Sequence, residues 1–147
     1  MHRFTNINGI NLIKHYEGFK PKPYFCIAGC ATIGFGHKIL ASENFTYLTE
    51  AEAETLLAAD LYTTEKAVIR LINTCLTDDQ FAALVSFTFN LGGSALQRST
   101  LRQKVNYGLF QECSEEFLKW CCVGGRKISG LIRRRTSEVK LFNSVYI

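Results

Sequence analysis

The chain has 147 residues, of which 47% are hydrophobic and 20% are charged, and its formal net charge is +4. This composition is typical of an ordinary globular protein, and the length allows one domain with a substantial core. No apolar run approaches the ~20 residues that span a bilayer, so we expect no stable membrane insertion.

A short helix is predicted at about residues 9–17, with Asn8 as its N-cap and Gly18 just beyond its last turn. Glu17 falls on the same face of this helix as its isoleucines. A glutamate that only decorates the surface would more naturally lie on the opposite face. Glu17 is therefore expected to be partly buried at the end of the helix.

A β-hairpin or small sheet is predicted next, in the stretch YFCIAGCATIGFGHKI. Its β-branched and aromatic residues are punctuated by glycines, and the turn is expected near Ala28–Gly29. Cys26 and Thr32 then lie on opposite arms of the hairpin. If the hairpin folds against the end of the first helix, Glu17, Cys26 and Thr32 can all face one point.

Helices predominate in the rest of the chain. Thr49 with Glu52, and Thr77 with Gln80, are capping-box signatures that open two helices. The first is predicted to be long, at about residues 50–72. The second is apolar on nearly all sides and is expected to be the central buried helix, ending at Gly92.

Further helices are predicted at about residues 99–107, 109–120 and 130–142, with Ser129 as the cap of the last one. A glycine-rich loop, VGGRKISG, precedes that last helix.

The predicted fold class is α+β, in a single domain over residues 1–147. A small N-terminal lobe of helix and β-hairpin (1–48) is joined by a linking helix (49–72) to an all-helical C-terminal lobe (73–147). A cleft between two such lobes is the expected place for a functional site.

Glu17, Cys26 and Thr32 have the side-chain chemistry of a hydrolytic site. Burial disfavours the ionised form of a carboxyl, which would suit Glu17 to act as a general acid. A thiolate can attack a substrate when its pKa is lowered, and a nearby threonine can orient a water. The alternative is structural, because a glutamate at a helix end more often forms hydrogen bonds and a hairpin cysteine more often packs.

The spacing of these residues resembles the signature of the phage-type lysozymes, glycoside hydrolase family twenty-four. That signature is a Glu, eight residues, an Asp or Cys, five residues, and a Thr that opens T-[IV]-G-x-G-H. This chain matches every fixed position from Glu17 to His37 and has Cys26 in the middle position. The segments ALVSFTFNLG, STLR and GLIRRR resemble the family's C-terminal lobe, so the resemblance covers essentially the whole chain.

The resemblance implies a lysozyme-like fold and an endolysin that cleaves the β-1,4 bond between N-acetylmuramic acid and N-acetylglucosamine in peptidoglycan. Glu17 would be the general acid, Cys26 the second catalytic group, and Thr32 its support. Cys26 is expected to be a nucleophile or an oriented base, and inversion or retention at the anomeric carbon is left open.

The same resemblance places the floor of a sugar groove near the end of the central helix and the start of the next one. An aromatic ring there can stack on a pyranose, and an amide can hold an acetamido group. Phe89 is equally well explained as part of the core. The predicted substrate-binding residues are Phe89, Asn90 and Thr100.

The C-terminal end is basic, because residues 126–147 carry six basic residues against one acid, a net charge of +5. This suggests an anionic partner such as the cell wall, with a solvated helix face as the alternative. One arginine of the run Arg133–Arg135 is expected to pair with Glu138 or another acid.

The six cysteines show no C-x-x-C spacing, so no metal site and no cofactor are predicted. Cys26 and Cys30 can form a reversible disulfide that silences the enzyme, although an unrelated turn cysteine is the commoner case. His37 is expected to pair with an acid or a carbonyl of the linking helix instead of taking part in catalysis.

The N-terminus does not resemble a signal peptide. We therefore expect a monomer that resides in the host cytoplasm, is released with the help of a holin, and acts on the cell wall. The competing hypotheses are an inactive peptidoglycan-binding module, a lytic transglycosylase, and a nucleic-acid-binding helical domain, which the hairpin does not favour.

Overall fold

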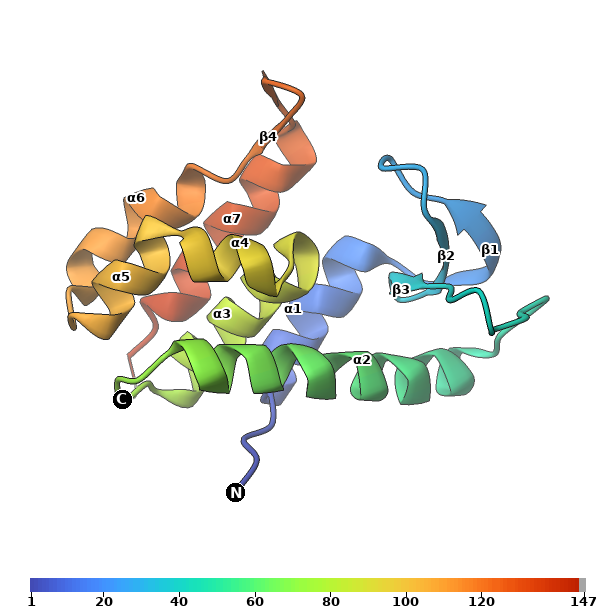
Figure 1. Cartoon of the computed structure of the whole chain (residues 1–147), viewed down its shortest axis with the longest axis horizontal. Helices are drawn as coiled ribbons and strands as arrows, with labels where there is room; N and C mark the ends of the chain where they lie inside the picture. Colours follow the sequence, from blue (N-terminus) through green and yellow to red (C-terminus); the bar gives the residue numbers. More distant parts are fainter. Residues whose placement is uncertain (146–147) are drawn as a thin grey trace. The chain divides into compact units, whose positions relative to one another are not determined.

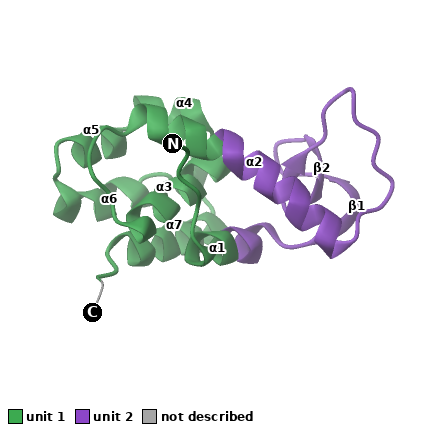
Figure 2. Cartoon of the chain, turned by 90° about the horizontal axis from the view of Figure 1, so that it is seen from below, with its two compact units in different colours: residues 1–12, 64–147 green, residues 13–63 purple. Residues whose placement is uncertain are grey.

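The structure is a computed structural model that describes residues 1–145 and consists of two compact units. Unit 2 comprises residues 13–63, and unit 1 comprises residues 1–12 with the chain from residue 64 onward (Figure 2). Two helices labelled in Figure 1, α1 (Ile7–Glu17) and α2 (Glu50–Leu71), contribute residues to both units, which Figure 2 distinguishes by colour. The combination of helices with a small antiparallel sheet confirms the predicted α+β class.

Unit 2 is built on an antiparallel sheet in the order β1 (Lys20–Phe25), β2 (Ala31–Gly34) and β3 (His37–Lys38). β1 and β2 form the predicted hairpin, and its turn at residues 27–29 lies where the sequence placed it. The unit's buried apolar side chains come from α1, the sheet, the loop before α2, and α2 itself: Ile13, Ile33, Phe35, Leu48, Ala53, Leu57 and Leu61.

The first helix starts earlier than predicted. The side chain of Asn6 accepts a hydrogen bond from the Gly9 N–H at 3.0 Å, so Asn6 caps α1 and Asn8 lies inside it. A side chain on Gly9 would lie 2.7 Å from the Ala82 Cβ, so the missing side chain lets this helical turn approach α3 (Asp78–Leu91) closely. The other end is as predicted, because Gly18 has φ 69° and its N–H donates to the Lys14 carbonyl.

Both predicted capping boxes are confirmed. The Glu52 N–H donates to Thr49 Oγ1 at 3.2 Å, and the Thr49 N–H donates to Glu52 Oε1 at 3.0 Å. Thr77 and Gln80 repeat this exchange at the start of α3 (Asp78–Leu91). Residues 81–88 of α3 are buried without interruption, which confirms that it is the central helix of unit 1.

The chain after α3 contains more elements than predicted. A helix α4 (Gly93–Arg98) follows Gly92 at once, before α5 (Thr100–Asn106), a short 3₁₀ turn η1 (Phe110–Glu112) and α6 (Cys113–Leu118). The sequence missed α4 because two glycines in succession usually end a helix. In the described part of the chain, no helix is long and apolar enough to cross a bilayer.

The glycine-rich loop is a small hairpin of β4 (Cys122–Val123) and β5 (Arg126–Lys127), which turns at two glycines of positive φ. The last helix, α7 (Ser129–Phe142), packs against α3. Ser129 is wrong as its cap, because it is already the first helical residue and Ile128 occupies the N-cap position without a side-chain bond.

A buried ion pair joins α7 to α3. Glu138 and Arg135 are both completely buried, and Arg135 Nε lies 2.7 Å from Glu138 Oε1. Glu138 Oε2 accepts hydrogen bonds from Ser86 Oγ at 2.5 Å and from Arg135 Nη2 at 3.1 Å. Arg134 is also buried, with Nε 3.5 Å from Glu138 Oε2. The predicted pairing of Glu138 with the arginine run is thereby confirmed.

Replacing Glu138 by alanine is expected to lower the free energy of unfolding by about 3–5 kcal/mol, because it leaves buried guanidinium groups without their counter-charge. Urea unfolding measures this loss. Glu115→Ala, an exposed glutamate on α6, is the matched control and is expected to change stability by less than about 0.5 kcal/mol. Similar small losses in both variants would contradict the structural role of the pair.

Candidate active site

Glu17 is the last residue of α1 and is half-buried. Its carboxylate packs directly against the backbone of Gly36, because a Cβ built on Gly36 would lie 2.5 Å from Glu17 Oε1. Gly36 also has φ 78°, a backbone conformation that side chains disfavour. The glycine of the predicted motif therefore makes room for the acid.

Cys26 lies at the end of the β1 arm, in a tight turn. Its N–H donates to the Cys30 carbonyl at 2.9 Å, and the Gly29 N–H donates to the Cys26 carbonyl at 2.8 Å. The strand register pairs Tyr24 with Thr32. Since side chains alternate along an extended arm, Tyr24, Cys26, Cys30 and Thr32 share one face of the hairpin.

The turn favours the ionised form of Cys26. Hydrogen bonding from the backbone of Cys30 is the largest of the effects that lower the pKa of the Cys26 thiol. Partial burial opposes this, and the backbone of Ala28 and the side chains of Thr32 and Cys30 add to the lowering. A hydrogen bond to the charged form of a group stabilises that form, so the hairpin raises the fraction of thiolate.

Thr32 is buried, and its Oγ1 donates to the Cys30 carbonyl at 2.9 Å. Both residues lie on the second arm of the hairpin, so this bond is local to the arm that carries Cys30. The strand register pairs Thr32 with Tyr24, two residues before Cys26. Thr32 therefore lies near Cys26 on the opposite arm, as the hairpin topology predicts.

Tyr24 is a further polar group of this face that the sequence analysis did not single out. Burial raises the pKa of its phenol, and the negative charges of Glu17 and Cys26 raise it further. The phenol therefore lies within electrostatic reach of both groups. The signal available in the sequence was its position two residues before Cys26, which puts both side chains on one face of a strand.

His37 is fully engaged in ion pairs, as expected for a structural residue. Its Nδ1 lies 2.8 Å from Asp60 Oδ2, and its Nε2 lies 2.9 Å from Glu43 Oε1. Asp60 belongs to α2, so the predicted pairing with an acid of that helix is confirmed. Burial disfavours the imidazolium, but the hydrogen bonds to Glu43 and Asp60 outweigh it and raise the pKa of His37.

The three predicted substrate-binding residues belong to unit 1, whereas Glu17, Cys26 and Thr32 belong to unit 2. Phe89 and Asn90 are half-buried near the end of α3, and Thr100 is exposed at the first position of α5. Asn90 Oδ1 accepts a hydrogen bond from Arg135 Nη2 at 2.9 Å. This bond orients the amide and leaves its Nδ2 as the group that can serve as a donor.

All six cysteines are free thiols. Among residues 1–145, no group of three or more His, Cys, Asp or Glu side chains is arranged to hold a metal ion.

An acid at the end of a helix, followed by a hairpin that carries a thiol, is the arrangement expected of a lysozyme-like fold. A model of the phage lysozyme family matches residues 14–138. The endolysin of Acyrthosiphon pisum secondary endosymbiont phage 1 is 38% identical over 143 residues, covering 92% of this chain and 95% of that protein. The endolysin of Bacillus phage B103 is 42% identical over 136 residues, covering 91% of this chain.

Among solved structures, the muramidase domain of SpmX from Asticaccaulis excentricus has a TM-score of 0.88 and 34% identity, covering 99% of this chain and 100% of that chain. The chain therefore belongs to the phage lysozyme family, and the resemblance found in the sequence is confirmed. The chain spans about half the length, 52%, of the Bacillus phage B103 relative.

Gly36→Ala is expected to lower activity on bacterial cell walls by about 10²-fold, because the new methyl group displaces the Glu17 carboxylate. Initial rates of wall clearing measure the loss. Gly125→Ala is the matched control, since Gly125 has nearly the same φ, 79°, but open space around its Cα. Equal losses in both variants would point to backbone strain in place of a displaced acid.

His37 is expected to make stability depend on pH. Because its folded-state pKa is raised, its contribution is fully present below its unfolded pKa of about 6.5 and is lost as the pH rises through the folded value. The stability difference between the wild type and His37→Gln should therefore shrink between about pH 5.5 and 8.5. Urea unfolding at both pH values tests this, with the exposed His15→Gln as control; a pH-independent difference would contradict it.

Proposed function

We propose that this chain is a muramidase that hydrolyses the β-1,4 bond between N-acetylmuramic acid and N-acetylglucosamine in bacterial peptidoglycan and so lyses the cell wall. The observation that carries the proposal is the placement of a carboxyl, Glu17, against Gly36 and of the Cys26 thiol on the hairpin that follows, in a member of the phage lysozyme family. Support also comes from relatives named endolysins and from a similar structure named a muramidase domain.

In the proposed mechanism, Glu17 is the general acid and Cys26 is the nucleophile. The Cys26 thiolate attacks the anomeric carbon while Glu17 gives its proton to the leaving glycosidic oxygen, so the glycosidic bond breaks as a carbon–sulfur bond forms. The Glu17 carboxylate then takes a proton from a water that attacks the same carbon, and the thiolate leaves. Two displacements give net retention of anomeric configuration.

Thr32 is proposed to support this reaction by stabilising the thiolate form of Cys26. Its side chain is one of the groups that lower the pKa of Cys26, through the single O–H that otherwise donates to the Cys30 carbonyl. A thiolate whose charge is already stabilised needs less rearrangement at the moment of attack.

The substrate contacts are proposed for unit 1. Phe89 would stack on a pyranose ring, the Asn90 Nδ2 would donate to an acetamido carbonyl, and the Thr100 hydroxyl would bind a sugar hydroxyl. The assignment for Asn90 follows from the hydrogen bond between its Oδ1 and Arg135, which occupies the acceptor side of the amide.

Only some of the basic residues at the C-terminal end are exposed and able to bind the anionic cell wall. Arg134 and Arg135 are buried with Glu138, so they do not contact the wall. Arg126, Lys127 and Arg133 are exposed and can attract the anionic polymer, with an effect that weakens as salt rises. We further propose that the enzyme acts as a monomer and that a holin releases it from the host cytoplasm.

Mass spectrometry of purified peptidoglycan after digestion tests the proposed reaction. The wild type is expected to release muropeptides with a reducing N-acetylmuramic acid end, and Glu17→Gln is expected to be about 10²–10⁴-fold slower. Anhydro products would identify a lytic transglycosylase, and no products from folded wild type would identify a binding module. Either outcome would overturn the proposal.

Cys26→Ser is expected to lower the rate by at least about 10²-fold, because a serine hydroxyl stays protonated where the thiol ionises. Cys26→Asp is expected to keep substantially more activity than Cys26→Ser, since an aspartate is ionised at neutral pH. Cys75→Ser, at an exposed cysteine in unit 1, is the control. Full activity in Cys26→Ser would remove Cys26 from the mechanism.

A further inference from the structure

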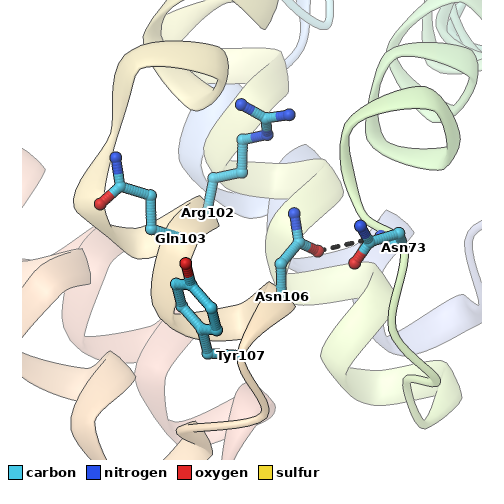
Figure 3. A pocket seen from close by; sticks show the side chains of 5 residues that line it. All are labelled: Asn73, Arg102, Gln103, Asn106 and Tyr107. Atoms are coloured by element: carbon cyan, nitrogen blue, oxygen red, sulfur yellow. Dashed lines mark hydrogen bonds between the residues drawn. The ribbon is translucent and has the colours of Figure 1, made fainter.

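We propose that a groove of unit 1, lined by residues whose side chains carry polar groups, is a second, non-catalytic binding site for a carboxylate-bearing saccharide. The groove has a volume of about 300 Å³, at the lower end of the range for ligand pockets. It lies at the end of α2 and along α5 (Figure 3), and its lining residues are Asn73, Arg102, Gln103, Asn106 and Tyr107.

Arg102 provides a fixed positive charge. Its Nε donates to the Leu71 carbonyl at 3.0 Å, and its Nη1 donates to the Gln97 carbonyl at 3.2 Å. Within residues 1–145, no carboxylate pairs with this guanidinium and its Nη2 has no acceptor. Backbone carbonyls hold the group in place without neutralising it, so an anion that binds there gains a charge-assisted hydrogen bond from a donor that is already ordered.

Asn106 and Asn73 form a rigid polar wall beside this charge. Asn106 Oδ1 accepts from the Asn73 N–H at 2.9 Å (Figure 3), and Asn106 Nδ2 donates to the Leu71 carbonyl at 3.0 Å. The bonds use the backbone groups left open at the end of α2. The side-chain amide of Asn73 is exposed and can hydrogen-bond a ligand hydroxyl.

Tyr107 and Gln103 complete the groove on the α5 side. They are four residues apart and therefore on one side of the helix. Tyr107 is 81% exposed, which is unusual for so large a ring, and Figure 3 shows it next to Gln103. An exposed ring offers a surface for the apolar face of a sugar, while the amide binds a hydroxyl or acetamido group.

The combination selects the class of ligand. A guanidinium alone binds carboxylate and phosphate alike, whereas the amides and the ring add recognition of a saccharide. The fragment with both features is the disaccharide–peptide unit of peptidoglycan, and this choice of source rests on the proposed function. Such a site would keep the enzyme on the wall between cleavage events, by raising its local concentration there.

Nuclear magnetic resonance titration of the full chain tests the site. The main probe is N-acetylglucosaminyl-N-acetylmuramic acid with its stem peptide, which lacks the bond that the proposed muramidase cleaves. We expect it to shift the amide signals of Asn73, Gln103, Asn106 and Tyr107 with a Kd on the order of 1 mM. Neutral chitobiose should bind at least about tenfold more weakly, because it lacks the carboxylate.

Inorganic phosphate separates the two anion chemistries. If phosphate shifts these signals as strongly as the disaccharide–peptide does, the groove is a simple anion site and the saccharide proposal is wrong. No shift of these signals with the disaccharide–peptide at about 10 mM would overturn the proposal as well. Neither result depends on cleavage, so a repeat with Glu17→Gln separates failure of this site from failure of the proposed muramidase.

Tyr107→Ala and Gln103→Ala remove groove side chains that make no bond to the rest of the fold, and each is expected to weaken binding by roughly threefold or more. Arg102→Lys keeps the charge but loses the anchored fork, so it should weaken binding without abolishing it. Tyr47→Ala, another exposed tyrosine but in unit 2, is the matched control and should leave the affinity unchanged. Equal affinity in all of these variants would rule out the groove.

Discussion

The hydrogen bonds within the turn from Cys26 to Cys30 are the interactions on which the proposed chemistry depends. They fix the pairing of the two hairpin arms and direct backbone N–H groups at the thiol. A thiol on an ordinary strand would remain mostly protonated at neutral pH, because nothing would stabilise its charge. The same turn brings Thr32 and Tyr24 onto the face of Cys26. In this member of the family, the backbone donors of a short turn therefore favour the ionised form of the thiol at Cys26.

Close packing fixes the other half of the site and its supports. Glu17 ends α1 against the bare backbone of Gly36, so its carboxylate is held by contact with the motif that follows the hairpin. In unit 1, the buried ion pair of Arg135 and Glu138 orients Asn90 in a similar way, because Arg135 donates one N–H to the side-chain oxygen of Asn90. In both units, groups near the proposed chemistry are oriented by neighbours that are themselves immobilised.

Local signals predicted much of this structure. The capping boxes, the positive-φ glycine after α1 and the hairpin turn all follow from residues within a few positions of one another. The predictions failed where the local structure depends on residues that are far away in the sequence. Asn6 and Asn8 are both plausible caps, and α4 begins at Gly93 although two glycines in succession usually end a helix. Burial of Arg134 and Arg135 in a run of basic residues depends on Glu138 and Ser86, which come from two different helices. The place of Cys26 followed from topology, but the lowering of its pKa depends on backbone donors that a sequence does not display.

The most direct test of the central claim is a pH titration of the Cys26 thiolate. Its ultraviolet absorbance is obtained as the difference between the wild type and Cys26→Ser, which removes the signals of the other five cysteines. The Cys26 component is predicted to titrate below the ordinary thiol value of 9.0, and Thr32→Val should move its midpoint upward. A Cys26 component that titrates at or above 9.0 would contradict a thiolate nucleophile prepared by the hairpin turn.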